Sequence, residues 1–191
     1  MNMQPILSFA HSLINKAVSE GDSVIDATVG NGHDTVFLAK LVGESGHVFG
    51  FDVQETAIQN TTKRLQAEKV DHRVTLFHKG HETILDSIPE TAHSTITGAI
   101  FNLGYLPHSD KNITTKPNTT IMAIEQILQM MQAGGIIVLV VYHGHEEGVI
   151  EKEQVLEYVQ HLDQQVAHVL QYGFINQKNN PPFVIAIEKR K

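Results

Sequence analysis

Hydrophobic residues recur along the chain with two alternating spacings, which predict an alternation of helices and strands. Segments with apolar residues every three or four positions are typical of amphipathic helices. Short apolar runs bounded by glycine or polar residues are typical of strands in a buried sheet. The predicted helices are residues 5–19, a segment ending near 42, 54–68, 81–88, 119–131 and 147–161. The predicted strands are 23–27, 47–52, 73–77, 96–102, 136–142, 166–174 and 183–188, and 89–95 and 107–119 are predicted loops.

The order of these elements predicts an α/β fold with a mostly parallel sheet and helices on both faces. The last two strands, 166–174 and 183–188, have no helix between them and are joined by the polar segment 176–182. Such a short connection joins antiparallel neighbours. A Rossmann-like, seven-stranded sheet ending in an antiparallel hairpin resembles the class I methyltransferase fold. No repeat or linker interrupts the pattern, so we expect a single domain over residues 1–191.

A strand-to-helix turn rich in glycine follows the first predicted strand, between Asp26 and Thr35. Glycine allows close approach of the backbone to a ligand, and open α/β sheets bind ligands at such turns. A carboxylate at position 26 repels a pyrophosphate and attracts a cationic group. The pattern of Asp26, Gly30 and Gly32 resembles the first motif of methyltransferases that use S-adenosylmethionine. A dinucleotide site is disfavoured because Thr35 occupies the sixth position of the fingerprint, and a turn without a ligand is the remaining alternative.

Further polar residues extend this predicted site. Asp52 ends the second strand, where an acid in this fold binds ribose hydroxyls, although it can also cap the next helix. Asp34 opens the first helix after the glycines, where it can face the donor or serve only as a cap. The predicted cofactor-binding residues are Asp26, Thr28, Gly30, Asn31, Gly32, His33, Asp34, Thr35, Asp52, Val53, Gln54, His81, Glu82 and Asn102.

The segment 102–108 ends the fourth predicted strand, beside the expected position of the methyl group. It is similar to the N-P-P-Y motif of methyltransferases that modify amines, in which the Asn oxygen and a backbone carbonyl accept hydrogen bonds from the target amine. Leu103 and Gly104 replace the two prolines. Asn102 and Tyr105 can alternatively be structural residues at a strand end. The predicted catalytic residues are Asn102, Tyr105 and His143, and the predicted substrate-binding residues are Tyr105, Leu106, Pro107, His108, Lys111, Lys116, Tyr142 and His143.

Histidine is abundant, but a metal site is not expected. The chain has 12 histidines and no cysteine, so chance spacing explains groups such as His78 and His81 or His143 and His145. His81 follows the third strand near the expected adenine position, although a loop histidine is often a surface residue. His11 lies in the opening helix, where a lone histidine is more often structural.

Charge and composition constrain the partners and the compartment. The net charge of −7 argues mildly against a nucleic-acid partner. Distribution matters more than the total, and Lys111 and Lys116 lie in the loop beside the expected site. Lys63, Arg64, Lys69 and Arg73 form a second basic group. The absence of cysteine, of a secretory signal pattern and of an apolar run of about 18 residues favours the cytoplasm and no membrane anchor.

With these motifs together, the chain resembles the YtqB-like methyltransferases, small bacterial proteins labelled as rRNA methylases that include the MnmM tRNA-modifying enzymes. The resemblance rests on segments 9–11, 26–35, 50–54, 101–107 and 141–145. It implies methylation of 5-aminomethyl-(2-thio)uridine at the wobble position of tRNA, with the anticodon region as partner.

Other functions remain open at this point. The alternatives are methylation of rRNA or of a small-molecule amine, a binding protein without chemistry, and a dehydrogenase. No separate RNA-binding domain is predicted. A homodimer would enlarge the basic surface available to RNA.

Overall fold

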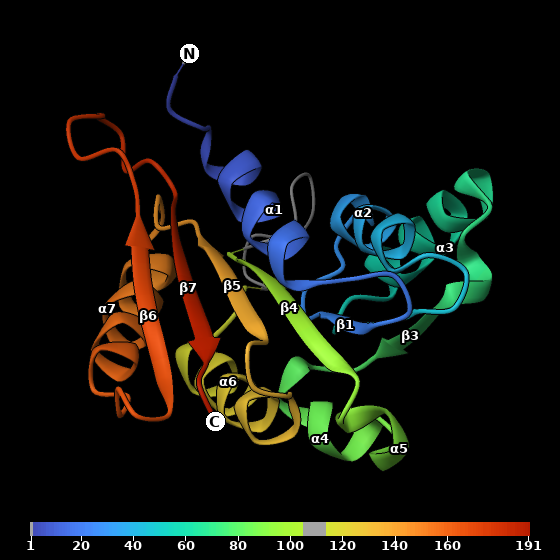
Figure 1. The fold of residues 1–191 in the computed structure, drawn as a ribbon. Helices are drawn as coiled ribbons and strands as arrows, with labels where there is room; N and C mark the ends of the chain where they lie inside the picture. The colour runs from blue at the N-terminus through green and yellow to red at the C-terminus, as the bar shows by residue number, and fades with distance from the viewer. Residues whose placement is uncertain (1, 105–113) are drawn as a thin grey trace.

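A computed structural model describes residues 2–104 and 114–191 and contains, within them, a seven-stranded sheet in the order β3-β2-β1-β4-β5-β7-β6 (Figure 1). Strands β1 to β5 are parallel, and β7 is antiparallel to both β5 and β6. The strands are β1 Ser23–Asp26, β2 His47–Asp52, β3 Val74–His78, β4 Ile96–Leu103, β5 Ile136–Val141, β6 Ala167–Tyr172 and β7 Phe183–Lys189. The predicted terminal hairpin and the predicted parallel sheet are both confirmed.

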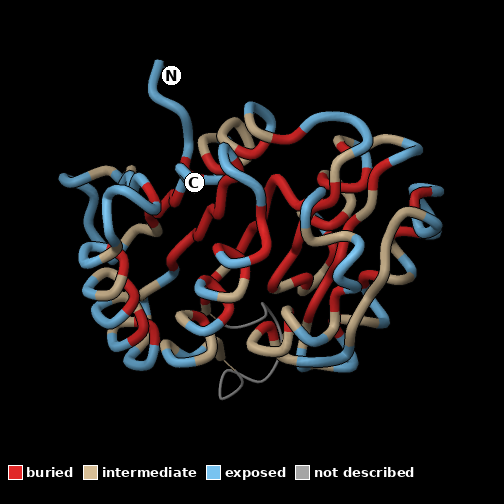
Figure 2. Tube along the Cα trace, turned by 60° about the horizontal axis from the view of Figure 1, so that its bottom comes forward, coloured by how far each residue is buried: buried red, intermediate tan, exposed pale blue. Residues whose placement is uncertain are grey.

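Helices cover both faces of this sheet. The described helices are α1 Ile6–Ala17, α2 His33–Val42, α3 Glu55–Glu68, α4 Ile84–Ser87, α5 Glu90–His93, α6 Pro117–Met130 and α7 Glu146–Gln160, with 3-10 turns η1 Asp71–Arg73 and η2 His81–Thr83. The hydrophobic side chains form two clusters, one with α1, α2 and α3 and the other with α4, α6 and α7. Figure 2 shows the buried chain concentrated in the central strands.

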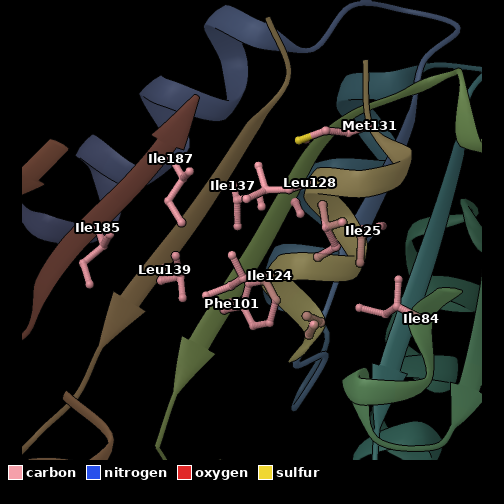
Figure 3. Close-up of a cluster of buried hydrophobic side chains, with 14 of the residues drawn as sticks. Ile25, Ile84, Phe101, Ile124, Leu128, Met131, Ile137, Leu139, Ile185 and Ile187 are labelled. Atoms are coloured by element: carbon pink, nitrogen blue, oxygen red, sulfur yellow. The ribbon is translucent and has the colours of Figure 1, made fainter. Parts of the chain in front are cut away.

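The position of strand β5, covered by helices on both faces, explains why every residue of the strand is apolar. Ile137, Leu139 and Val141 belong to the cluster under α6 and α7, whereas Ile136, Val138 and Val140 face α1. Successive side chains of a strand point to opposite faces, so a strand covered on both sides needs no polar residue. Figure 3 shows Ile137 and Leu139 beside Phe101 of β4 and Ile185 of β7.

Several predicted boundaries differ from the structure by one or two residues, and two of the differences involve a proline. The predicted loop 89–95 contains the short helix α5, which Pro89 precedes as its N-cap. The predicted helix 119–131 begins earlier, at Pro117. Proline has no N–H to lose at the first helical position and its fixed φ suits a helix start, so it marks the beginning of α6 rather than the end of a loop.

The order of strands creates the crevice that positions the site. Strand β1 lies between β2 and β4, so the chain turns to one side after β1 and returns to the other side at β4. At such a reversal the connections diverge and leave a crevice at the carboxyl ends of the strands. Asp26 of β1, Asp52 of β2 and Asn102 of β4 lie at these ends.

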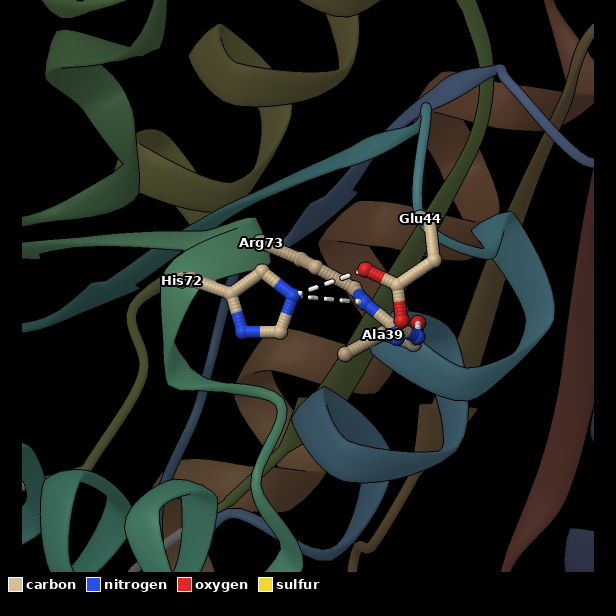
Figure 4. A network of polar contacts seen from close by, with 4 residues as sticks. All are labelled: Ala39, Glu44, His72 and Arg73. Carbon is tan, nitrogen blue, oxygen red and sulfur yellow. Dashed lines mark hydrogen bonds and ion pairs between the residues drawn. The ribbon is translucent and has the colours of Figure 1, made fainter.

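Arg73 holds the end of α2 and is not available to a basic surface. Its Nη1 donates a hydrogen bond of 3.2 Å to the carbonyl of Ala39, and its side chain forms an ion pair with Glu44 (Figure 4). The Nε2 of His72 lies 3.0 Å from the same carboxylate. Only 12% of the Arg73 side chain is exposed. The predicted second basic group therefore loses this member to a structural role.

The described part of the chain contains no helix that is long and apolar enough to cross a bilayer.

Candidate active site

A cavity of about 1370 Å³ opens at the carboxyl ends of the strands. Most of the predicted site residues line it. They are Thr28, Gly30, Asn31, His33, Asp34, Asp52, Val53, Gln54, His81, Glu82, Asn102, Lys116, Tyr142 and His143. Residues as distant in sequence as Thr28 and His143 therefore share one cavity. Tyr105, Leu106, Pro107, His108 and Lys111 lie outside the described residues.

The glycine turn shapes one wall. Gly30 and Gly32 have φ values of 51° and 78°, a region that favours glycine. A Cβ on Gly32 would lie 3.0 Å from the Cα of Thr61, so Gly32 also allows α3 to pack closely on the turn. Gly32 itself does not line the cavity. Its role in the structure is the turn and this packing.

Asp52 connects the turn to strand β2. Its Oδ2 accepts a 3.0 Å hydrogen bond from the N–H of Gly30, and its Oδ1 accepts a 2.9 Å bond from the N–H of Gln54. Burial raises the pKa of Asp52, although these two N–H groups oppose the shift. Each carboxylate oxygen keeps a second lone pair for a hydroxyl. The N-cap of α3 is Gln54, and Asp52 bonds the N–H of that residue while it also lines the cavity.

Asp26 lies beneath the cavity rather than in its wall. Its side chain is completely buried, and its Oδ2 accepts a 2.6 Å hydrogen bond from the hydroxyl of Thr35. Its Oδ1 accepts from the N–H of Thr28 at 3.2 Å. Burial raises the pKa of Asp26 to about 7. The expectation that this carboxylate attracts a cationic ligand directly does not fit its position, and Thr35 is likewise withdrawn from the cavity.

Asp34 is the acid that faces the cavity. Its Oδ1 accepts a 2.7 Å bond from the Nε2 of His11, and its Oδ2 accepts a 2.6 Å bond from the Nδ2 of Asn102. Burial alone would raise the pKa of Asp34, but the bonds from His11 and Asn102 outweigh it and keep the pKa below its ordinary value. The ring of His11 stacks on Phe37 at 4.2 Å between centroids. His11 thus joins the site rather than only supporting its helix.

His81 lines the cavity, and one nitrogen of its ring is buried. Its Nδ1 lies 3.1 Å from the carbonyl of Ala27, which can only accept, so Nδ1 carries the proton. Its Nε2 is then an acceptor, and that buried atom has no hydrogen-bond partner among residues 2–104 and 114–191. Burial lowers the pKa of His81, which keeps the ring neutral. A buried acceptor without a donor costs free energy.

Tyr142 and His143 follow strand β5 on the other side of Asn102. The N–H of Tyr142 donates to the carbonyl of Leu103 at 3.1 Å. The Nε2 of His143 donates to the carbonyl of Pro181 at 3.0 Å, and its ring lies against Phe183. The C-terminal hairpin therefore holds this wall.

The structure adds lining residues that sequence patterns did not identify. They are Leu7, Thr114, Thr115, Thr119, His145 and Asn180. Hydroxyl and amide residues in loops are too common to mark a site by themselves. One sequence signal could have identified Thr114 and Thr115 as lining residues. They lie just before the helix start at Pro117, where the chain lies at the carboxyl ends of the strands.

Within residues 2–104 and 114–191, no group of three or more histidine or acidic residues is arranged to hold a metal ion.

The architecture is the class I methyltransferase fold, and comparisons identify the family within it. A crystal structure from Clostridium thermocellum described as a "putative rRNA-methylase" is 46% identical, with a TM-score of 0.95 over 99% of this chain and 100% of that chain. A Streptococcus mutans methyltransferase, solved in complex with SAH, is 39% identical, with a TM-score of 0.88 over 98% of this chain and 99% of that chain.

The family model described as "Putative rRNA methylase" matches residues 48–188. The chain therefore belongs to this family. The chloroplastic tRNA (mnm(5)s(2)U34)-methyltransferase of Arabidopsis thaliana is 38% identical over 154 residues, which are 76% of this chain and 56% of that protein. The chain thus spans about half the length of this curated relative.

The burial of Asp26 generates a prediction about stability and pH. The pKa of Asp26 is about 7 in the folded protein and 3.8 for an unperturbed aspartate, so folding binds a proton between these pH values. This carboxyl therefore lowers the free energy of unfolding as pH rises from about 4 to 7, by at most about 1.4 kcal/mol per pH unit.

We expect the free energy of unfolding of Asp26→Asn to rise relative to that of the wild type as pH increases across that range, because the amide does not titrate there. The Thr35 hydroxyl can accept a hydrogen bond from the amide in place of donating one to the carboxylate. Urea unfolding of both proteins at several pH values measures the difference. A difference that stays constant between pH 5 and 7 would show that the folded carboxyl is already ionised.

Proposed function

We propose that this protein is a tRNA methyltransferase that uses S-adenosylmethionine to convert 5-aminomethyl-(2-thio)uridine at the wobble position into 5-methylaminomethyl-(2-thio)uridine. The substrate assignment is supported by the 38% identity to the Arabidopsis protein, which is named a tRNA (mnm(5)s(2)U34)-methyltransferase. The anticodon region as docking partner, the homodimer and the cytoplasm remain predictions.

The cavity has the chemistry that the donor requires. Asp52 offers carboxylate oxygens to a vicinal diol. Val53 is 56% exposed beside Asp52, so an adenine ring can lie on its apolar surface. Asp34 supplies negative charge beside Asn102. When bound, the donor supplies a methyl group already activated by its sulfonium.

Asn102 has a fixed orientation that suits an acceptor amine. An ionised Asp34 carboxylate accepts hydrogen bonds only, so the Nδ2 of Asn102 must face it. Its Oδ1 then points elsewhere and accepts no hydrogen bond from the described part of the chain. The backbone N–H of Asn102 donates to the Thr28 hydroxyl at 2.7 Å, which fixes the main chain as well. An oxygen held in this way can accept an amine N–H and direct the nitrogen lone pair.

The acceptor must lose a proton before it can attack. A free alkylamine has a pKa near 10, so it enters largely as an ammonium ion. Desolvation in the cavity disfavours the charged form and assists loss of this proton. Tyr142 and His143 lie where they can line the pocket for the uracil ring. The contribution of the chain is therefore alignment, desolvation and orientation of one lone pair.

A second candidate is methylation of rRNA. The family description names rRNA, and the ribosomal RNA small subunit methyltransferase H of Oenococcus oeni is 33% identical over 90 residues. That alignment covers 47% of this chain and 28% of that protein, which is a smaller share than the Arabidopsis relative covers. The tRNA assignment therefore has the stronger support.

Nucleoside mass spectrometry tests the function directly. tRNA from cells lacking this protein should contain 5-aminomethyl nucleosides that gain one methyl group when incubated with purified protein and S-adenosylmethionine. Asn102→Ala should transfer the methyl group roughly 100-fold more slowly, because it removes an oriented polar group.

Asn118→Ala serves as the matched control, since this exposed asparagine of α6 lies outside the cavity. Unmodified tRNA after incubation, together with methylated rRNA in the same assay, would replace the tRNA assignment with the rRNA one.

Salt dependence distinguishes RNA from a small amine as the acceptor. Lys116 is exposed at the cavity rim, at the start of α6. If it contacts an RNA phosphate, Lys116→Ala should reduce the slope of log affinity against log salt concentration by about 1. Lys16→Ala, at the opposite end of α1 from the cavity-lining residue Leu7, should leave the slope unchanged. An affinity for tRNA that does not vary with salt in the wild type would argue for the small-molecule alternative.

A further inference from the structure

A buried carboxylate lies behind the cavity wall beside Asn102. Glu151 of α7 is 1% exposed, and its two oxygens accept hydrogen bonds from two threonine hydroxyls. Thr120 of α6 donates to Oε1 at 2.7 Å, and Thr115 donates to Oε2 at 2.5 Å. Burial raises the pKa of Glu151, while the two hydroxyls oppose the shift.

One of these two bonds continues to the cavity. The Oγ1 of Thr115 accepts a 2.9 Å bond from the N–H of Gly104, and the N–H of Thr115 donates to the carbonyl of Gly104 at 3.0 Å. Gly104 and Thr115 both line the cavity, two and thirteen residues after Asn102. Thr120 does not line it. Glu151 is thus connected to the cavity wall through Thr115. Through Thr120 it is connected to helix α6, away from the cavity.

The chemistry of the carboxylate sets the direction of this chain of bonds. An ionised carboxylate only accepts, so it takes the Thr115 hydroxyl proton and leaves the hydroxyl lone pairs for the N–H of Gly104. A neutral apolar residue would pack α6 against α7 without the cost of burying a charged group. Among the described residues of the cavity wall, the carboxylate fixes the position of Thr115 and, through it, of Gly104.

We infer that Glu151 is a positioning residue for the acceptor, holding through Thr115 the wall of the cavity that borders Asn102. Gly104 follows the strand end that carries Asn102, and a Cβ on Gly104 would lie 3.4 Å from the Cβ of Tyr142. Gly104 therefore lies close beside Tyr142, which we place at the uracil pocket. This inference rests on the proposed function, because it concerns the acceptor and not the donor.

The matched pair Thr115→Val and Thr120→Val tests the inference. Each variant keeps the side-chain shape and removes one hydrogen bond to the same carboxylate, and Thr115→Val also removes the acceptor of the Gly104 N–H. Both should lower the urea midpoint. Thr115→Val alone should raise KM for tRNA about tenfold, the size expected for one hydrogen bond, with SAH affinity within about twofold of the wild type. Thr115→Ser should restore KM.

Exchange of the Gly104 amide, followed by NMR, provides a readout that does not depend on activity. It should accelerate in Thr115→Val, which has no acceptor for that N–H, and not in Thr120→Val. Equal KM values for the two valine variants, or unchanged exchange of the Gly104 amide, would overturn the inference. The proposed function would still stand in that case, provided that the wild type methylates tRNA. A wild type that does not methylate tRNA would instead refute the proposed function.

Discussion

The carboxylate of Asp34 is the interaction on which the site depends. It accepts hydrogen bonds from His11 of α1 and from Asn102 at the end of β4, so one side chain joins three segments that are distant in sequence. The partial charge at the start of α2 also favours an anion there. Because the carboxylate accepts only, it determines which atom of Asn102 faces the cavity. The proposed chemistry follows from that orientation.

The two acids of the glycine segment have different roles, one structural and one at the cavity. Asp26 is withdrawn into the protein, where the hydroxyl of Thr35 and the N–H of Thr28 surround it and burial raises its pKa to about 7. Asp34 remains at the cavity with a lowered pKa, because donors from His11 and Asn102 outweigh its burial. A buried acid that fixes the turn and an ionised acid that faces the ligand thus lie within one short segment.

The sequence was sufficient to predict the sheet, the terminal hairpin and the positions of Asp52 and Asn102, because each depends on local periodicity or on a strand end. It did not predict that Asp26 is buried, since this depends on which side chain meets its oxygens. The contact between His11 and Asp34 spans 23 residues, and that between Thr115 and Glu151 spans 36. Such pairings come from tertiary packing, and no local pattern reports them.

The most direct measurement of the central claim is a double-mutant cycle on the rate of methyl transfer in a single turnover at saturating donor. Asp34→Asn, Asn102→Ala and the double variant are compared with the wild type. If Asp34 acts by orienting Asn102, the double variant should be no slower than Asn102→Ala alone. If the two rate losses multiply in the double variant, Asp34 acts independently of Asn102 and this account of the site is wrong.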